Sequence, residues 1–198
     1  MAWYFFRHGK TIWNEEKRLQ GIRDIPLSTI GINQAYKLQE NLKNVKFDLV
    51  FSSPLIRAIE TAKIVTRVDN IILDKRIKEM SFGINEGAFY SFSNDVTIDQ
   101  LGQNIFNLTH KPSSYIPPQD AESFNSLIER TKEFLFFLKH NYSYEQNIAI
   151  FAHGGVVHSI IYNLENRTDL NTFWLPKIGN CGYLKLINNE KMELVTLD

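Results

Sequence analysis

The chain has 198 residues, of which 43% are hydrophobic and 22% are charged. This length predicts a single domain, and these fractions are ordinary for a globular protein. Its 22 Lys and Arg residues balance its 22 Asp and Glu residues, which argues against a general binder of nucleic acid or of anionic membranes, because such proteins usually carry a basic excess.

The first half of the chain alternates apolar runs with amphipathic patterns. The apolar runs predict strands at residues 2–6, 47–51 and 71–73. Residues 32–43 place Ala35, Leu38 and Leu42 on one face, which predicts a helix.

The second strand leads into a further predicted helix. Ser53 is a favourable N-cap residue, and Pro54 suits the first helical position, where its missing N–H has no partner to lose. Ala58 and Ala62 then recur at helical spacing along one side.

Residues 84–120 form the least regular part of the chain, and one short helix at 97–109 is predicted within them. We expect this segment to be an insertion over one end of the sheet, above the active site, and not a second domain. The elements predicted beyond it are a helix at 121–140, a strand at 148–152, a helix at 155–165 and two closing strands at 182–187 and 192–197, with a hairpin around Asn188-Asn189 as one option.

This order of strands and helices predicts an α/β fold with a mainly parallel central sheet, in one domain over residues 1–198. Ligands of such sheets bind beyond the carboxyl ends of the strands. Three strand ends therefore become candidate site segments, namely Arg7-His8-Gly9, Ser52-Ser53 with Arg57, and His153-Gly154-Gly155.

The cysteine content and the N-terminal sequence indicate in which cellular compartment the protein is expected. Cys181 is the only cysteine, so no disulfide can form within the chain, and a small, partly buried thiol is expected. The N-terminus lacks the pattern of a signal peptide, and no apolar run approaches the roughly 18 residues of a membrane span. We therefore expect a cytoplasmic protein.

Two of the five histidines share one context. His8 and His153 each follow an apolar strand and precede a glycine, so both should emerge at the same edge of the sheet. The other three, His110, His140 and His158, are predicted in a loop, at a helix end and within a helix, where structural roles are expected.

Two arginines supply positive charge at this edge. Arg7 adjoins His8, and Arg57 lies in the first turn of a predicted helix. Arginine binds phosphate bidentately and stays charged, and a helix N-terminus adds N–H donors. Together with His153, these residues predict a compact anion pocket and suggest phosphoryl transfer, in which one histidine attacks and the cations neutralise charge.

Other chemistries lack their motifs. The sequence has no His-Glu-x-x-His, no cysteine cluster, no Gly-x-Ser-x-Gly and no Gly-x-x-x-x-Gly-Lys-Ser/Thr. We therefore expect neither a metal nor another cofactor.

Four blocks of the sequence resemble the histidine phosphatase superfamily in its phosphoglycerate-mutase-like branch. They are Arg-His-Gly-Lys-Thr-Ile-Trp-Asn at 7–14, continued by matches at 19–35, then residues 51–62, 78–87 and 150–155. Together the blocks are highly specific and stand in the expected order. The resemblance implies the three-layer α/β/α fold of that branch.

The resemblance also implies catalytic roles. His8 would accept the phosphoryl group, and Arg7, Arg57 and His153 would hold its oxygens. Glu79 would be the general acid that protonates the leaving oxygen and then the base that activates water. That role requires a pKa raised from roughly 4.3 by burial or by a nearby phosphate.

Further residues follow from the same resemblance. Asn14 would donate a hydrogen bond to the phosphate, Gln20 and Gly21 would shape the rim of the pocket, and Gly154 is placed with the phosphate-binding residues. Glu86 is the second candidate for the role of general acid.

One departure from the family pattern concerns charge. Lys10 stands where the family usually has Glu or Gln. There it either adds positive charge to the pocket or points to solvent, and the sequence does not decide between the two.

The comparison with glycolytic mutases favours hydrolysis. The resembling mutases grip their substrate with paired arginines in a longer insertion and with a C-terminal lid. Here residues 84–120 hold no arginine, and no basic tail follows the last predicted strand. We therefore predict a phosphatase that hydrolyses small-molecule phosphomonoesters through a phosphohistidine. Phosphoglycerate mutase activity is the alternative, and a non-catalytic phosphate-binding protein is a third.

The expected partner is a small phosphorylated metabolite, and neither nucleic acid nor membrane. The sequence leaves open the physiological substrate and the oligomeric state, for which a homodimer is one option.

Overall fold

The computed structural model describes residues 1–188 and 191–197. These residues form one sheet of six strands in the order β3-β2-β4-β1-β5-β6. The strands are β1 (Ala2–Arg7), β2 (Leu49–Ser52), β3 (Ile72–Leu73), β4 (Ile148–Ala152), β5 (Tyr183–Ile187) and β6 (Lys191–Val195). Strands β1 to β4 are parallel, whereas β5 pairs antiparallel with β1 and β6 pairs antiparallel with β5, so the predicted α/β fold with a mainly parallel sheet is confirmed.

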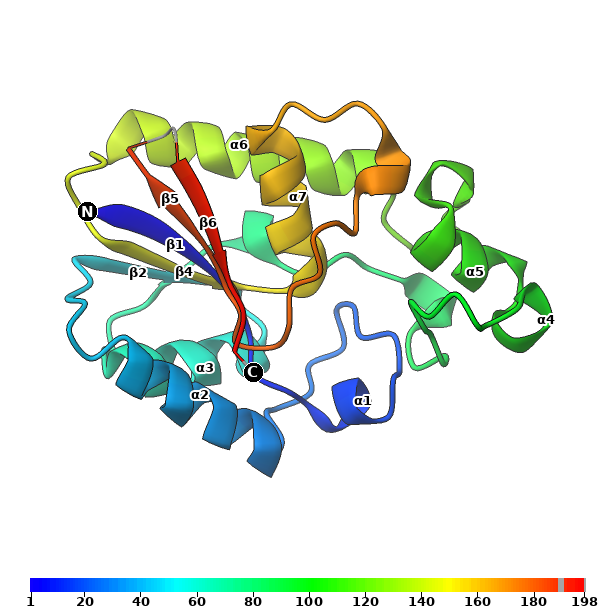
Figure 1. Ribbon diagram of the computed structural model, residues 1–198, viewed down its shortest axis with the longest axis horizontal. Helices are drawn as coiled ribbons and strands as arrows, with labels where there is room; N and C mark the ends of the chain where they lie inside the picture. The colour runs from blue at the N-terminus through cyan, green and yellow to red at the C-terminus, as the bar shows by residue number, and fades with distance from the viewer. Residues whose placement is uncertain (189–190, 198) are drawn as a thin grey trace.

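Helices cover both faces of this sheet (Figure 1). One face carries α6 (Phe124–Asn141) and α7 (Gly154–Leu164), and the other carries α2 (Thr29–Asn41) and α3 (Ile56–Thr66). The fold therefore has the three layers that the resemblance implies. The shorter helices beyond the end of the sheet are α1 (Ile12–Glu15), α4 (Ile98–Leu101) and α5 (Gln103–His110).

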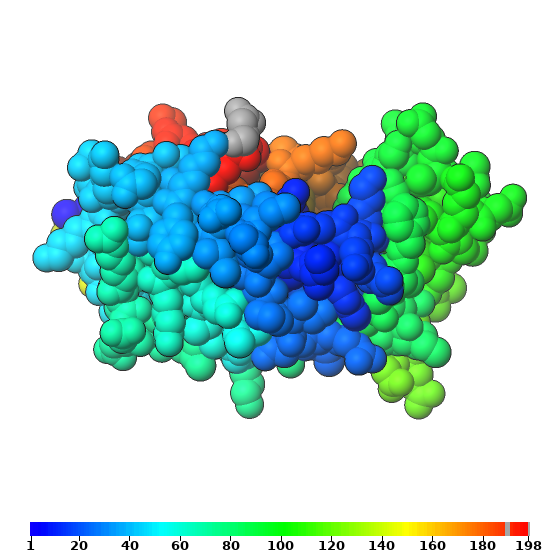
Figure 2. All heavy atoms as spheres, turned by 90° about the horizontal axis from the view of Figure 1, so that it is seen from below, coloured from blue at the N-terminus to red at the C-terminus, as the bar shows by residue number. Residues whose placement is uncertain are grey.

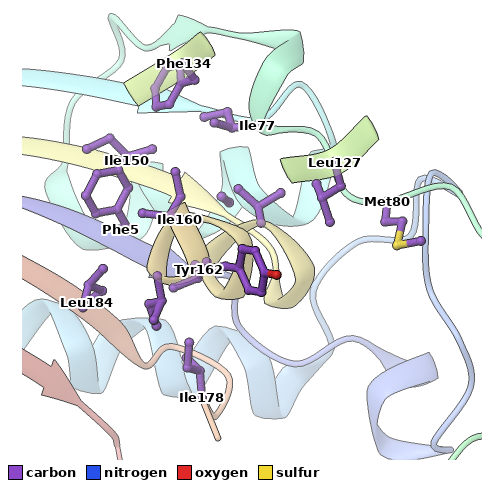
Figure 3. Packing of buried hydrophobic residues seen from close by; sticks show 14 of the residues in the cluster. Phe5, Ile77, Met80, Leu127, Phe134, Ile150, Ile160, Tyr162, Ile178 and Leu184 are labelled. Carbon is purple, nitrogen blue, oxygen red and sulfur yellow. The ribbon is translucent and has the colours of Figure 1, made fainter. Parts of the chain in front are cut away.

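Successive side chains of β1 point to opposite faces of the sheet and pack into the two halves of the core. Trp3 and Phe5 pack into the cluster beneath α6 and α7, while Tyr4 and Phe6 pack against α2 and α3. Figure 3 shows Phe5 beside side chains of β4 and α7. Each buried aromatic side chain contributes about 1.5–3 kcal/mol to folding, which fixes β1 as a central strand and so holds its carboxyl end in place.

The predicted position of Ser53 as N-cap of α3 is wrong, because Leu55 holds that position. The hydroxyl of Ser53 bonds instead to the ring of His153. The carboxylate of Asp24 accepts a hydrogen bond of 2.7 Å from the N–H of Ile56 in the first turn. Contacts from distant segments therefore replace the local cap.

The segment 84–120 departs from its prediction in two respects. The predicted helix at 97–109 forms as two helices, because Gly102 adopts a φ of 76° between α4 and α5. His110, expected in a loop, is the last residue of α5. Figure 2 shows this segment (green) at one end of the molecule against N-terminal residues (dark blue), where Leu19 N–H donates to Ala88 O at 2.8 Å.

The closing strands pair as predicted, with Ile187 opposite Lys191. Asn189 of the predicted hairpin turn lies outside the described residues. Cys181 is fully buried with a φ of 58°, and not partly buried as expected. Among the described residues, no helix has the length and apolarity needed to cross a bilayer.

Candidate active site

The carboxyl ends of three adjacent parallel strands bring the predicted segments together. His8 follows β1 and donates its backbone N–H to Ala152 O of β4 at 3.1 Å, and Ser53 follows β2 and donates to Phe151 O at 2.9 Å. His153 follows β4. The ring centroids of His8 and His153 lie 5.2 Å apart.

The hydrogen bonds of His8 define its tautomer. Its Nδ1 lies 2.6 Å from Gly9 O, a carbonyl that can only accept, so Nδ1 carries the proton. The Nε–H of Arg57 points at Nε2 from 3.2 Å, so Nε2 holds a lone pair. Burial lowers the pKa of His8 well below 6.5, and the charges of Arg57 and Arg7 lower it further. His8 is therefore a neutral imidazole whose Nε2 carries a lone pair.

Arg57 is a fully buried cation in the first turn of α3. Its Nη1 donates to Arg23 O at 2.9 Å and its Nη2 to Gly21 O at 2.7 Å. Burial lowers its pKa to about 10, which leaves the guanidinium charged at neutral pH. The two carbonyls hold this charge beside His8 with little freedom to move.

Three buried donors around His8 make no hydrogen bond within residues 1–188 and 191–197. They are Arg7 Nε, Gln20 Nε2 and His153 Nδ1. Leaving such a group unpaired costs about 1–3 kcal/mol. Each of the three side chains is anchored at another atom, so the free donors are fixed in direction.

The anchors of these three side chains come from different parts of the fold. Arg7 Nη1 donates to Ile178 O at 2.7 Å, and Gln20 Oε1 accepts from Thr11 Oγ1 at 2.6 Å. His153 Nε2 lies 2.7 Å from Ser53 Oγ. Ser53 Oγ also accepts from the N–H of Leu55 at 3.3 Å. When the hydroxyl gives its own proton to His153 Nε2, the ring proton of His153 lies on Nδ1, the ring atom without a partner.

Glu79 lies buried between two backbone donors. Oε1 accepts from the N–H of Met80 at 2.9 Å and Oε2 from the N–H of Gly155 at 3.1 Å. Burial raises the pKa of Glu79 above 4.5, although both N–H bonds and Arg57 oppose the shift. A side chain at Gly155 would place its Cβ 2.6 Å from Glu79 Oε1, so the carboxyl group depends on a glycine there.

Glu86, the second candidate for the general acid, has a different environment. Its carboxylate accepts from the N–H groups of Ile22 at 2.8 Å and Arg23 at 3.0 Å. Glu79 lines the cavity described below, whereas Glu86 does not; Arg57 and His153 also lie behind the lining, beside His8. Gly21 also lies outside the cavity lining. A Cβ at Gly21 would come within 2.4 Å of Glu86 Oε1, and its carbonyl serves to hold Arg57.

A cavity of about 570 Å³ opens over His8. Its inner end is lined by Arg7, His8, Asn14, Gln20, Glu79 and Gly154. The amide oxygen of Asn14 accepts from Thr11 N–H at 3.2 Å and from Asn180 Nδ2 at 3.3 Å, which leaves its own amide group as a donor. Lys10 is not among the lining residues.

Several lining residues carry no signal in the sequence. His110 and His158, expected to be structural, both line the cavity, as do Trp174 and Lys177. Ser53 and Gly155 stand inside the motif blocks, but their contacts with His153 and Glu79 join segments distant in sequence. No group of three or more His, Cys, Asp or Glu residues that could hold a metal ion occurs in the part of the chain that the structure describes.

Comparisons with known proteins agree with this geometry. The model of the histidine phosphatase superfamily (branch 1) matches residues 3–197. A Hydrogenobacter thermophilus protein that bears the name "Putative phosphoserine phosphatase 2" is 31% identical, over 98% of this chain and 94% of its own. A 2,3-bisphosphoglycerate-dependent phosphoglycerate mutase of Chlamydia muridarum is 29% identical, over 82% of this chain and 83% of its own.

The fold of this chain is also similar to a solved structure. The phosphoserine phosphatase of Entamoeba histolytica, in complex with 3-phosphoglyceric acid, superposes with a TM-score of 0.81 at 26% identity, over 100% of this chain and 98% of that one. Because the family match covers nearly the whole sequence, the chain belongs to branch 1 of the histidine phosphatase superfamily.

Proposed function

We propose that this protein is a phosphatase that hydrolyses small-molecule phosphomonoesters through a phosphohistidine at His8. The observation that carries the proposal is the lone pair of a neutral, fixed imidazole surrounded by buried donors without partners, those of Arg7, Gln20 and His153. A phosphomonoester supplies the oxygens that such donors require. Its transition state spreads charge over those oxygens, so positioned donors and cations stabilise it.

In the first half of the reaction, the Nε2 lone pair of His8 leaves its hydrogen bond with the Nε–H of Arg57, attacks phosphorus and forms the P–N bond. The bond from phosphorus to the ester oxygen breaks, and its electron pair stays on that oxygen. Glu79 gives its proton to the oxygen, so the product alcohol leaves neutral. The raised pKa of Glu79 keeps that proton available.

In the second half, Glu79 acts as a carboxylate base. It takes one proton from a water molecule as the water oxygen attacks phosphorus. The P–N bond breaks, its electron pair returns to Nε2 of His8, and inorganic phosphate leaves. Arg57, held by two carbonyls beside His8, stays charged through both halves.

Water is a more plausible acceptor here than a second hydroxyl of the substrate. A mutase must bind both anionic ends of its substrate and keep the phosphohistidine from reacting with water. Residues 84–120 contain no arginine, and Lys111 is their only lysine. We treat residues 1–198 as one catalytic domain in which this segment covers the cavity, a placement supported by the lining residues Tyr90 and Phe92.

A phosphomonoester panel tests the proposal, beginning with phosphoserine and 3-phosphoglycerate because relatives carry those names. We expect release of inorganic phosphate and an acid-labile phosphoryl group on His8 in rapidly quenched samples, detected by mass spectrometry. Interconversion of 3- and 2-phosphoglycerate at mutase rates without phosphate release would instead establish a mutase. Phosphate binding without any phosphorylated His8 would establish a binding protein.

Ser53→Ala tests the tautomer of His153. Without the Ser53 hydroxyl, the proton of His153 is free to move to Nε2, and the donor to phosphate at Nδ1 is lost part of the time. We expect kcat/KM to fall by about tenfold, equivalent to one hydrogen bond of about 1.4 kcal/mol. Nitrogen NMR of the His153 ring should show the change of tautomer. An unchanged tautomer with an unchanged rate would remove this role of Ser53, and Ser126→Ala on the exposed side of α6 serves as the control.

A further inference from the structure

The cavity extends far beyond the space that one phosphoryl group needs. Its volume of about 570 Å³ lies in the range of roughly 300–1,000 Å³ found for sites that enclose whole organic ligands. Beyond the inner end, its lining includes what we call the outer wall, which consists of Tyr90, Phe92, Trp174 and Leu175.

The outer wall is built as a rigid apolar surface. Tyr90 and Phe92 meet edge to face at 5.6 Å between centroids, and Phe92 meets Trp174 at 5.4 Å. Trp174 is fixed by its Nε1–H, which donates to Leu108 O at 2.7 Å, and by packing against the buried ring of Phe173 at 4.8 Å. These side chains are already held in place, so binding of a ligand to the outer wall does not require them to lose conformational freedom.

Part of this wall is open to solvent. Phe92 is 39% exposed and Leu175 is 53% exposed, although both line a cavity. Contact with an apolar ligand would remove that surface from water and stabilise the complex.

The polar groups near the outer wall are mostly occupied by the protein itself. His110 bonds to Ser93 O at 3.0 Å through Nε2, and Asn171 Oδ1 accepts from Ser113 Oγ at 2.9 Å. The ring nitrogens of His158 face carbonyl oxygens. This half of the cavity is therefore poorly suited to a small, highly polar substrate.

The charges that line the cavity are distributed unevenly. Lys177 is exposed, lines the cavity and makes no ion pair with any described residue. Glu79 is the only acidic residue in the lining, among the residues described, and the proposed reaction begins with it protonated. An anionic group on the substrate therefore has a partner in Lys177, whereas an ammonium group has none.

We propose that the substrate is a phosphomonoester with an apolar, preferably aromatic, body that rests on the outer wall, with a terminal anionic group paired with Lys177 and without an ammonium group. This inference rests on the proposed phosphatase activity and adds the substrate class. It distinguishes the protein from an enzyme specific for phosphoserine, whose ammonium group would find no carboxylate other than Glu79 in the described cavity lining.

Alkyl phosphates with similar leaving alcohols test the substrate class. We expect kcat/KM for benzyl phosphate to exceed that for ethyl phosphate by at least about tenfold, because the ring buries apolar surface. A carboxylate in the para position should raise it by a further factor of about three, as a partly exposed ion pair allows. Phosphoethanolamine, which adds an ammonium group to ethyl phosphate, should react more slowly than ethyl phosphate.

Two variants and their controls assign these preferences to residues. Phe92→Ala should lower the ratio of benzyl to ethyl phosphate, whereas Phe136→Ala, an exposed phenylalanine on α6, should leave it unchanged. Lys177→Met should abolish the gain from the carboxylate, whereas the exposed Lys139→Met should keep it. Thermal melting of each variant verifies that it is folded.

The outcomes separate this inference from the function on which it rests. If no phosphomonoester is hydrolysed and His8 is never phosphorylated, both proposals fail. If ethyl phosphate, benzyl phosphate and phosphoethanolamine react with equal kcat/KM, the protein is a phosphatase and only the substrate class is overturned. A preference for benzyl phosphate that Phe92→Ala does not alter would remove the outer wall as its source.

Discussion

In His8→Ala, we expect hydrolysis of every phosphomonoester to fall by about 10⁴-fold or more, since loss of a covalent nucleophile removes the intermediate itself. The imidazole Nε2 is the atom that attacks the substrate in the first half of the proposed reaction, and without it the phosphohistidine cannot form. Phosphate binding should persist, because the donors of Arg7, Gln20 and His153 remain. Steady-state kinetics with p-nitrophenyl phosphate and calorimetry with inorganic phosphate measure the two effects.

The control for this prediction is His140→Ala, which removes an exposed histidine of α6 and should leave kcat/KM unchanged. The His8→Ala protein should also remain folded, since the lost ring is neutral and the buried guanidinium of Arg57 keeps its bonds to Arg23 O and Gly21 O, although its Nε–H loses an acceptor. Hydrolysis by a folded His8→Ala protein at more than a hundredth of the wild-type rate would contradict the phosphohistidine mechanism.

Glu79→Gln should reduce hydrolysis of alkyl phosphates by about 10²–10⁴-fold, the usual contribution of a general acid or base. Its first step with p-nitrophenyl phosphate should be less affected, because nitrophenolate leaves without a proton. The second step still lacks its base. Stopped-flow measurements should therefore show a burst of nitrophenolate equal to the enzyme concentration, together with accumulation of phosphorylated His8.

The role of Glu79 as general acid also predicts the direction in which kcat/KM changes with pH. Burial raises the pKa of Glu79, and only its protonated form serves the first step. Wild-type kcat/KM for an alkyl phosphate should therefore fall as the pH rises through that pKa. On the acid side the rate should persist well below pH 6.5, where His8 is still neutral because its own pKa is lowered.

Two results would contradict this assignment of Glu79. One is an equal loss for alkyl and nitrophenyl substrates without a burst, and the other is an alkaline fall that Glu79→Gln leaves in place. Glu129→Gln, an exposed carboxylate of α6, is the matched control. In Glu79→Gln, the new NH₂ group would lie against one of the two backbone N–H groups that now donate to the carboxylate. Because two donors cannot bond to each other, we expect some loss of stability, which thermal melting will measure.

The strands and their ends were accessible from the sequence because their signals are local. The apolar run before His153 predicts residues 148–152, and β4 has those bounds. The same reasoning places His8 and His153 at one edge, since parallel strands end together. The helix in 84–120 was predicted less well, because one glycine with positive φ divides it.

The position of Glu79 in the site could not be predicted from the local sequence pattern. It lies in a loop, without periodicity, and only the family resemblance singled it out. Its burial between Met80 N–H and Gly155 N–H joins residues 76 positions apart in the chain. Such a contact depends on how α7 begins, which no window of sequence around Glu79 contains.

The sequence by itself determined the α/β class, the edge of the sheet that holds the site, and the neutral chain's small cluster of cations there. Only the tertiary structure decided that Ser53 fixes His153 instead of capping a helix, and that Trp174 and Lys177 complete the cavity. The physical reason is the range of the interactions. Hydrophobic periodicity and turn residues act over a few positions, whereas these side chains find partners across the chain, as Ser53 and His153 do 100 residues apart.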